Sequence, residues 1–394
     1  MLKGPLPLLL VLVFLNIAGF SLILPLLPFY GHAFAASPFA VACLFAAYSF
    51  GNVLGEIFWG RRSDALGRKP ILVMTTAGAA LSYVAFAFAP TLLVAIVIRV
   101  ITGFFSGTLG VVQGMLADLT PPSERARFMG YFGASFNLGF AIGPAIGGVL
   151  ASPELGLQGF YTPILAAAAF AGAASTWAML ALPHRLPQTG AQRAMPSYTE
   201  GLEIVASNPI LVRLFVIAFI GIAAFSSVEA VFGLWTGGEY AWTSRQVGLT
   251  FLAVGGTGLL VQALLIGPLV KRFGESCVIA GGIVVLFTAI ALLPVLRYPA
   301  ITVALMALLM AGHSLAFPNA GALVSRNAPV DRQGSVMGLN MASNALSRIV
   351  APPLFGWVFS LSNDAPFYLC ALLMTVAFGI SLSIIALQKK ALSQ

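Results

Sequence analysis

Apolar runs long enough to cross a lipid bilayer follow one another along almost the whole of this chain. A transmembrane helix needs about 20 apolar residues, and the sequence contains twelve runs of that order, separated by glycines, prolines and clusters of charge. Only 8% of the residues are charged, whereas an ordinary soluble domain has about 25%. The sequence therefore predicts an all-α integral membrane protein with twelve transmembrane helices.

The expected helices fall into two sets of six. They cover about 6–30, 38–60, 70–88, 91–117, 127–150 and 161–182, and then 209–234, 246–268, 276–295, 299–325, 334–359 and 366–388. The first run is too long for a signal-peptide core, so we expect it to remain as the first helix. The predicted domains are a first bundle, a polar cytoplasmic linker and a second bundle, at 1–183, 184–208 and 209–394. Twelve spans leave no room for a catalytic domain outside the membrane.

The basic residues are distributed unevenly between the two sides of the predicted membrane. The net charge is +8, and all but four of the 20 Lys and Arg residues fall on the side of the termini. Arg245 and Arg297 fall on the other side, and Arg99 and Arg348 lie within spans. Because basic loops stay in the cytoplasm, both termini are expected there. The charge thus reflects topology and contact with anionic lipid rather than nucleic-acid binding.

The two halves of the chain repeat one another at an offset near 208 residues. Pro121, Met129, Ser135, Pro144 and Gly148 recur as Pro329, Met337, Ser343, Pro352 and Gly356, and Gly60 and Gly67 recur at an offset of 207 as Gly267 and Gly274. Parallel repeats of this kind produce two pseudosymmetric bundles, with a binding site near the midplane of the membrane.

Glycines crowd the fifth predicted helix. They are Gly130, Gly139, Gly143, Gly147 and Gly148, and Pro144 lies among them. In water, each glycine in a helix interior costs about 1 kcal/mol relative to alanine, whereas in a bilayer small residues let a neighbouring helix approach closely. A packed partner can also cover the carbonyl that Pro144 leaves unbonded. The stretch is therefore predicted to pack tightly at membrane depth.

This spacing resembles the fifth-helix motif of antiporters in the major facilitator superfamily. Residues 59–69, WGRRSDALGRK, are similar to the signature loop of that superfamily, and residues 117–127, ADLTPPSERAR, are similar to a segment of its twelve-helix drug:proton antiporters. Arg99 and Gly103 resemble the helix-4 motif. The sequence departs from these patterns at Ala65, where a basic residue is usual, and at Thr102, where glutamine is usual. The likeness is strong in the first half and weaker in the second.

The resemblance implies a gating network at the cytoplasmic ends of the helices. In this network, Asp64 would pair with Arg68 and Asp118 with Arg125, and the pairs would latch the bundles until the inner gate opens. The matching motif residues are Gly60, Asp64, Gly67, Arg68, Lys69, Asp118 and Arg125. The alternative interpretation is a set of solvated ion pairs, each stabilising the chain by less than about 1 kcal/mol.

A second group of residues is expected to line a substrate cavity or to carry protons, because polar groups at membrane depth are costly. The cavity residues are Asn16, Phe20, Arg99, Gln113, Asn137, Phe140, Phe225, Gln262, His313, Asn340, Asn344 and Arg348. One stripe, comprising Arg99, Gly103, Ser106, Gly110 and Gln113, is expected to face the cavity. The candidate proton carriers are Glu229, Glu56 and His313. Glu229 could instead lie at the outer water boundary, Glu56 could pair with the arginines of the signature loop, and His313 could form a hydrogen bond between helices.

Tetracycline exporters carry acidic residues where this chain has Asn16 and Ser82, which puts recognition of a metal–tetracycline complex in doubt. The cavity suits an amphiphilic organic molecule of either charge. The resemblance implies a proton-coupled antiporter in a bacterial inner membrane, exporting a drug-like compound by alternating access as a monomer, without a cofactor or metal. Sugar or metabolite export, proton-linked import and a transport-inactive receptor remain alternatives. A membrane enzyme is disfavoured because no nucleophile–base or metal-ligand pattern occurs, and Cys43, Cys277 and Cys370 are scattered.

Overall fold

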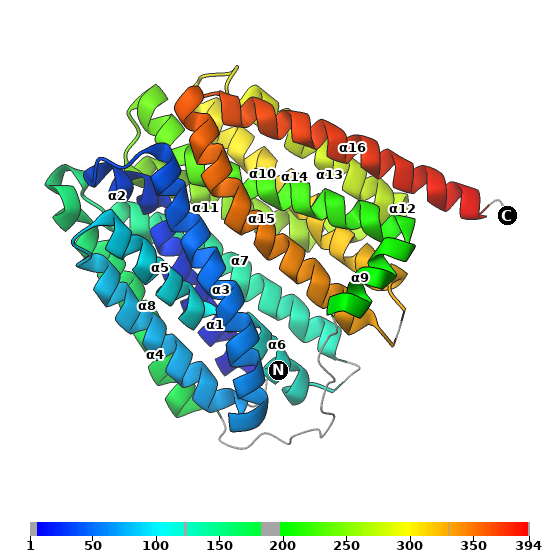
Figure 1. Cartoon of the computed structure of the whole chain (residues 1–394), viewed down its shortest axis with the longest axis horizontal. Helices are drawn as coiled ribbons and strands as arrows, with labels where there is room; N and C mark the ends of the chain where they lie inside the picture. Colours follow the sequence, from blue (N-terminus) through cyan, green and yellow to red (C-terminus); the bar gives the residue numbers. More distant parts are fainter. Residues whose placement is uncertain (1–5, 122–123, 183–197, 330, 393–394) are drawn as a thin grey trace. The chain divides into compact units, whose positions relative to one another are not determined.

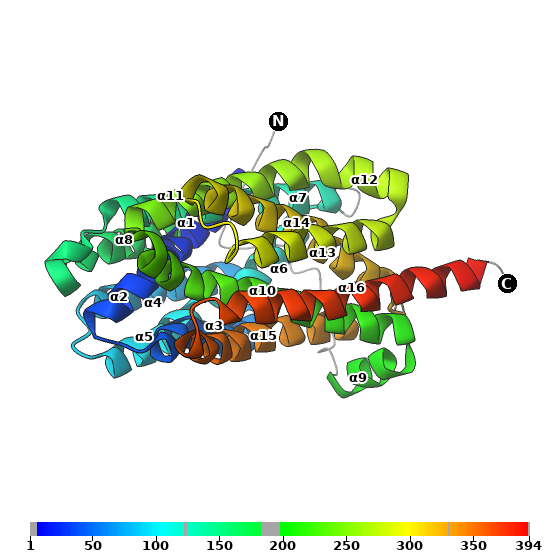
Figure 2. The same ribbon diagram turned by 90° about the horizontal axis from the view of Figure 1, so that it is seen from above.

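The structure is a computed structural model that describes residues 6–121, 124–182, 198–329 and 331–392. Within these ranges, eleven helical segments are long and apolar enough to cross a membrane. Most of their ends lie within three residues of the expected spans. Pro38–Leu66 and Pro209–Tyr240, however, end six residues later than expected, Ser244–Phe273 ends five residues later, and Pro153–Ala181 begins eight residues earlier. The remaining expected span, 334–359, is formed by α15 (Gln333–Leu361), which is 29 residues long. α15 is more polar than the others because it contains Asn340, Asn344 and Arg348. The all-α transmembrane fold is thus confirmed (Figure 1 and Figure 2).

The chain divides into two compact units, Met1–Ala191 with Thr236–Gly256, and Gln192–Trp235 with Thr257–Gln394. The sequence predicted a division at the linker 184–208, most of which, 184–197, lies outside the described residues. The helices of the first unit are α1 (Leu6–Ile23), α2 (Leu27–Ala33), α3 (Pro38–Leu66), α4 (Arg68–Ala87), α5 (Leu92–Ser106), α6 (Leu109–Leu119), α7 (Arg125–Leu150) and α8 (Tyr161–Ala181). In this unit α1 packs on α7 and α8, α3 on α5, and α4 on α8 (Figure 1).

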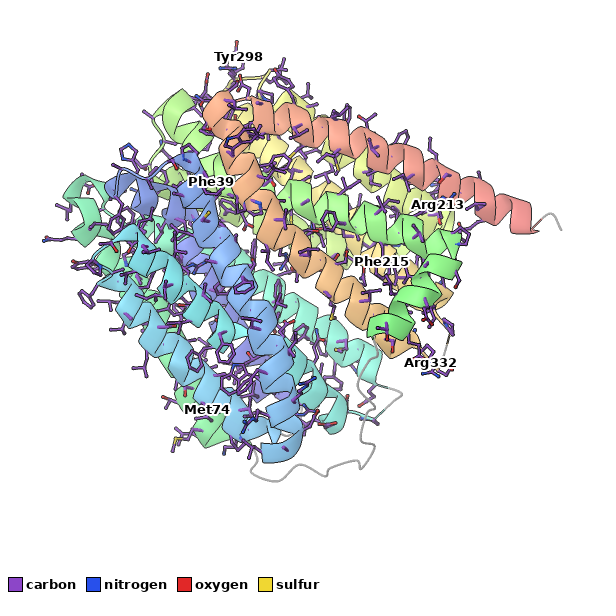
Figure 3. All side chains as sticks on the ribbon, viewed as in Figure 1. Phe39, Met74, Arg213, Phe215, Tyr298 and Arg332 are labelled. Carbon is purple, nitrogen blue, oxygen red and sulfur yellow. The ribbon has the colours of Figure 1, made fainter. Side chains whose placement is uncertain are left out.

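The second unit contains the remaining helices. They are α9 (Tyr198–Ser207), most of α10 (Pro209–Tyr240), the end of α11 (Ser244–Leu260), α12 (Ile266–Phe273), α13 (Glu275–Leu292), α14 (Pro299–Asn327), α15 and α16 (Ala365–Leu392). α13 packs on both α14 and α16. α9 occupies part of the predicted linker and packs on α15, where Arg332 bonds Glu200 at 2.6 Å; Figure 3 labels Arg332.

Three expected helices are interrupted, each at a defined place. The first contains a 3₁₀ turn at Leu24–Leu26, where Pro25 cannot donate a backbone hydrogen bond. The fourth breaks between α5 and α6 at Gly107 and Thr108, which leave helical geometry. The eighth contains a π-helical turn at Val261–Leu265. Such turns often occur at functional sites, and Gln262 lies in this one.

Large apolar side chains are exposed on the surface, as bilayer contact requires. Phe39 is 47% exposed and Met74 is 45% exposed, and both are labelled on helices of the first unit in Figure 3. Phe88, Leu93 and Leu180 are likewise exposed. Their exposure in a chain with so few charges is explained by lipid contact.

The internal repeat predicted from the sequence is visible in backbone geometry. Gly67 separates α3 from α4 with φ +91° and ψ 155°, and Gly274 separates α12 from α13 with φ +79° and ψ 159°. Both glycines adopt a positive φ that other residues rarely reach. Pro144 and Pro352, a second repeated pair, both lie inside helices. The two halves therefore share local structure as well as sequence pattern.

Candidate functional site

The second unit contains a polar cluster built around Glu229 of α10. The Oε1 atom of Glu229 is buried and has no hydrogen-bond partner. Arg348, on α15, is exposed, and its positive charge lies near enough to act on both the Glu229 carboxyl and His313 of α14. Three predicted site residues, from three helices, are thus brought together. An ionised carboxylate in such a position depends on its arginine neighbour, because burial removes the stabilisation that water provides.

Aromatic rings surround the imidazole of this cluster. The ring of Phe225 lies 4.4 Å from the His313 ring, centroid to centroid, and the ring of Phe317 lies 4.7 Å from it. Phe317 in turn packs against Gly221 of α10, where a Cβ would overlap the phenyl ring. The histidine is therefore held between apolar surfaces from α10 and α14, an environment suited to a flat organic group.

Two amides of α15 add unsatisfied acceptors to the second unit. The Oδ1 atoms of Asn340 and Asn344 are buried and have no hydrogen-bond partner. The two asparagines lie two turns and one turn before Arg348. One face of α15 therefore carries two amides followed by a guanidinium. Buried acceptors without partners cost free energy in the folded protein. A bound ligand with hydrogen-bond donors would relieve that cost.

Arg99 is a buried charge at membrane depth in the first unit, with only 1% of its surface exposed. Its Nε donates to the Leu44 carbonyl at 3.3 Å, while Nη1 and Nη2 have no hydrogen-bond partner. The guanidinium instead lies over the ring of Tyr48, 4.6 Å from its centroid, and 5.8 Å from that of Phe86. Cation–π contact therefore replaces an ion pair, and Arg99 is enclosed by α3 and α4.

We expect Arg99→Lys to lower the free energy of unfolding by about 1–2 kcal/mol, because a compact ammonium loses the flat contact with two rings. Arg99→Met keeps the stem and removes the charge, so it should be at least as stable as the wild type. Thermal unfolding in detergent distinguishes the two variants. Equal losses in both variants would contradict the assignment of cation–π contact as the dominant interaction.

The residues of the stripe that contains Arg99 lie in two different environments. Ser106 and Gly103 are buried with Arg99, and a Cβ on Gly103 would overlap the Tyr48 carbonyl of α3. This part is a helix contact instead of the expected cavity wall, because small residues let α3 and α5 cross closely. Gly110, in contrast, has nothing within 4 Å of a Cβ, and Gln113 is only half-buried.

The other predicted cavity residues of the first unit lie on α1 and α7. Asn16 and Asn137 are half-buried. Phe20 stacks on Tyr48 with ring centroids 4.5 Å apart, and Phe140 is parallel to Phe136 at 6.5 Å. Ser82, by contrast, is buried and donates to the Ala79 carbonyl at 2.8 Å. In the second unit, Gln262 is exposed on its π-helical turn.

The motif between α3 and α4 forms a network around Arg68. Its Nη1 bonds Asp64 at 2.9 Å and also donates to the hydroxyl of Ser63 at 2.6 Å. Its Nε contacts Asp118 of α6 at 3.4 Å. The expected partner of Asp118 was Arg125, which begins α7 and whose side chain lies outside the described part of the chain. Arg68 thus joins both aspartates.

The remaining motif residues pack close to this network. Lys69 is buried, and its Nζ donates to the Leu182 carbonyl at the end of α8 at 2.6 Å. Gly60 has open space where a Cβ would lie, whereas a Cβ on Gly114 would lie 3.0 Å from the Arg68 guanidinium. Glu56 is half-buried on α3, beside Gly107, at the break of the fourth span. The motif therefore fastens α4 to α6 and α8.

The glycines of α7 make the close helix contacts that the sequence predicted. Methyl groups on Gly143 and Gly147 would overlap atoms of Ser21 and Leu22 on α1, and a methyl on Gly139 would lie 2.9 Å from the Phe14 carbonyl oxygen. Ser21 also donates to the Gly139 carbonyl at 3.0 Å. Gly130 differs, because nothing lies within 4 Å of its Cβ position.

A second face of α7 packs on the part of α11 that belongs to the same unit. A methyl on Gly148 would overlap the Ser244 carbonyl, and one on Gly248 would overlap that of Pro144. Gly255 lies equally close to Ala141. α7 is therefore held between α1 and α11 by small residues on both sides, which explains why the compact unit includes 236–256.

Sequence comparison assigns this architecture to a family. The family model described as Major Facilitator Superfamily matches residues 9–352 and 214–392. The chain belongs to the major facilitator superfamily. As a member, it is a multi-pass membrane transporter, and the enzyme hypothesis is set aside on that ground.

Relatives of this major facilitator include resistance proteins of bacteria. It is 29% identical over 393 residues to the tetracycline resistance protein, class D, of Salmonella ordonez, covering 97% of this chain and 96% of the relative. It is 26% identical over 382 residues to multidrug resistance protein 2 of Bacillus subtilis (strain 168), covering 94% and 92%. The expected likeness to tetracycline and multidrug efflux proteins is confirmed.

A solved structure confirms the major facilitator fold independently. The nucleoside transporter NupG superposes with a TM-score of 0.73 at 16% identity, covering 98% of this chain and all of that one. At such low identity the likeness concerns the fold alone.

The sequence did not identify several residues that pack around Arg68, around His313 and between α3 and α5 in this transporter. Ser63 and Gly114 contact Arg68, and Phe317 closes over His313. Gly51 and Gly55 let α3 approach α5, with Gly51 meeting the Val100 carbonyl. Their four-residue spacing could have revealed the helix contact, as it did on α7. Nothing in the local sequence signals that Ser63 or Phe317 matters.

Proposed function

We propose that this major facilitator is a proton-coupled antiporter that exports a small amphiphilic, drug-like compound by alternating access. The relatives supply the class of substrate, since they include tetracycline and multidrug resistance proteins. The glycine-rich α7 supports antiport, because its spacing matches the antiporter motif throughout. The proposed setting is a bacterial inner membrane, with both termini in the cytoplasm and a monomeric protein.

The observation that carries the proposal is the unpartnered carboxyl oxygen of Glu229. The ionised form of this group depends on Arg348, whereas its protonated form needs no counter-ion. Any movement that separates the carboxyl from Arg348 therefore favours proton uptake, and any return favours release. This dependence is what a coupling residue requires. Glu56 and His313 are the other candidate carriers.

The same cluster supports an amphiphilic substrate. Phe225 and Phe317 provide flat apolar contacts beside His313, and the unbonded Oδ1 atoms of Asn340 and Asn344 can accept hydrogen bonds. A compound with an aromatic body and a few N–H or O–H donors fits this chemistry. The neutral Asn16 favours such a compound over a metal–tetracycline complex.

The proposal is tested in proteoliposomes that enclose a pH-sensitive dye. Under an imposed pH gradient, we expect one class in a panel of cationic, neutral and anionic amphiphiles to trigger proton movement above that of protein-free liposomes. Sugars in the same panel should have no effect. A response to sugars alone would instead establish the metabolite-transporter alternative. Proton movement in the same direction as the substrate would contradict antiport.

A further inference from the structure

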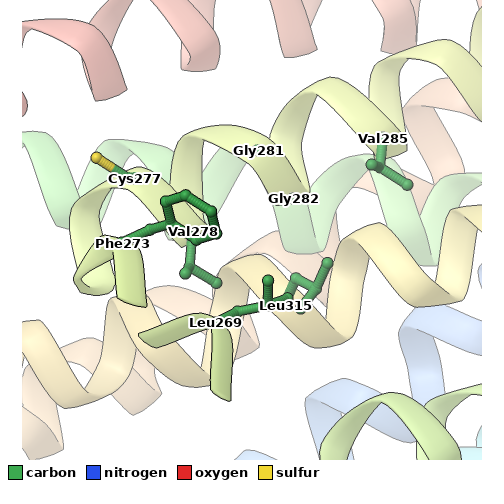
Figure 4. Close-up of a pocket in the computed structure, with 8 residues that line it drawn as sticks. All are labelled: Leu269, Phe273, Cys277, Val278, Gly281, Gly282, Val285 and Leu315. Atoms are coloured by element: carbon green, nitrogen blue, oxygen red, sulfur yellow. The ribbon is translucent and has the colours of Figure 1, made fainter. Parts of the chain in front are cut away.

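An apolar groove runs along the surface of the second unit, lined by none of the residues of the polar cluster. Its volume is about 300 Å³, and it lies between the end of α12, the first half of α13, and α14 (Figure 4). Leu269 and Phe273 form one wall, Val278 and Val285 line the length, and Leu315 closes the far side. Nearly all of its lining is hydrocarbon, so it suits an alkyl chain better than a polar ligand.

Glycine keeps this groove open. Gly281 and Gly282 form its floor, but only Gly282 has a packing role, since a Cβ there would lie 2.8 Å from the Ala316 nitrogen. Gly281 is exposed, and nothing lies within 4 Å of its Cβ position. A larger residue at 281 would fill the groove without disturbing any neighbouring helix.

A polar mouth adjoins one end of the groove. A second cavity of about 320 Å³ shares Phe273 and Cys277 with the first and is lined by Glu275, Ser276, Arg326 and Gln388. Glu275 accepts from Arg326 at 3.3 Å, and Ser276 donates to Gln388 at 2.6 Å. An apolar channel that opens at a polar, partly exposed mouth has the layout of a lipid chain and its headgroup.

The charge at the mouth favours an anion. Lys271 and Arg272 lie in the last turn of α12, and the Arg272 guanidinium lies 5.2 Å from the Phe273 ring centroid. Together with Arg326, which lines the mouth, three basic residues thus lie at or next to the segments that form it, whereas Glu275 is the one carboxylate in its described lining. The positive excess lies on the side that the loop charges assign to the cytoplasm, where anionic lipid headgroups attract basic residues.

We propose that this groove and its mouth, together the α12–α13 groove, bind one phospholipid with an anionic headgroup. One acyl chain lies along Val278, Gly281 and Val285, and the phosphate contacts Lys271, Arg272 and Arg326. The site is separate from the proposed transport route and does not depend on it. A lipid bound there contacts both α12 and α13 and thus stabilises the turn between them.

The test uses native mass spectrometry of the full chain, titrated with phosphatidylglycerol or phosphatidylcholine. We expect tighter binding of phosphatidylglycerol, weakened about fivefold for each charge removed in Lys271→Gln, Arg272→Gln and Arg326→Gln. Gly281→Leu should reduce binding of both lipids. Gly379→Leu is the matched control, since Gly379 is an exposed helical glycine outside both cavities and its Cβ position is open.

Cys277 reports the location of the bound lipid, because it is exposed and lines both cavities. Its rate of modification by N-ethylmaleimide, followed by peptide mass spectrometry, should be lower in nanodiscs with phosphatidylglycerol than in phosphatidylcholine alone. The triple charge variant should lose this difference. Equal rates in both lipids, equal protection by inorganic phosphate, or protection only by a drug-like amphiphile would each overturn the proposal.

Discussion

Glu229→Gln is expected to abolish transport driven by a pH gradient while leaving substrate exchange across the membrane intact. Glutamine keeps the shape of the protonated carboxyl but can neither gain nor lose a proton. Proton-driven accumulation in proteoliposomes should therefore fall to the level of protein-free liposomes. Exchange of labelled for unlabelled substrate requires only alternation of the loaded protein, so its rate should stay near that of the wild type.

Glu239→Gln is the matched control for this experiment, since Glu239 is an exposed carboxylate on the same helix, α10. It should behave as the wild type in both assays. If Glu229→Gln still accumulates substrate in response to a pH gradient, Glu229 is not the carrier, and Glu56 or His313 takes its place in the proposal. Loss of exchange together with coupling would indicate instead that Glu229 binds substrate.

Among the proposed substitutions, Gly147→Ala is expected to lower the free energy of unfolding the most. The added methyl would overlap the Leu22 carbonyl, so α1 and α7 must move apart along a contact that also includes Gly139 and Gly143. Overpacking of this kind lowers the free energy of unfolding by about 1–3 kcal/mol. Thermal unfolding in detergent should show a clear decrease in midpoint, and less protein should be recovered from the membrane.

Gly130→Ala provides an internal control on the same helix. Gly130 has nothing within 4 Å of its Cβ position, and alanine is the better helix former by about 1 kcal/mol. This variant should be as stable as the wild type or more so. If both substitutions were equally harmful, close packing on α1 would not be the reason for the glycines of α7.

The sequence predicted the transmembrane helices closely, because hydropathy alone fixes where a helix can lie in lipid. The expected 299–325 span corresponds to Pro299–Asn327, and 127–150 corresponds to Arg127–Leu150. Interruptions were harder to predict. Pro25 signals the 3₁₀ turn of the first span, but one glycine among many does not identify Gly107 as a break, and nothing in the sequence marks the π-helical turn of the eighth.

The polar clusters could be predicted only in part, since they depend on distances between helices. The cost of charge in lipid identified Glu229, His313 and Arg348 one by one. That Arg348 interacts with both others follows only from how α10, α14 and α15 pack. Arg99 illustrates the limit: its position was expected to line a cavity, whereas the rings of Tyr48 and Phe86 enclose it.

For the cytoplasmic motif too, the sequence predicted which residues take part but not all of their partners. Motif resemblance identified Asp64, Arg68 and Asp118 as a network, but the structure joins Asp118 to Arg68. Arg68 is one residue past Gly67, whose positive φ turns the chain at the start of α4. Pairing across this turn depends on backbone geometry that residue spacing does not reveal.

The most direct test of the central claim is proton release on substrate binding, measured with the purified protein in weakly buffered detergent solution. The antiport proposal predicts that a binding compound displaces protons from the wild type and from Glu239→Gln, but none from Glu229→Gln. Calorimetry on the same samples verifies that the compound binds. Binding without proton release from the wild type, or unchanged release from Glu229→Gln, would contradict the proposal that Glu229 couples the proton to the substrate.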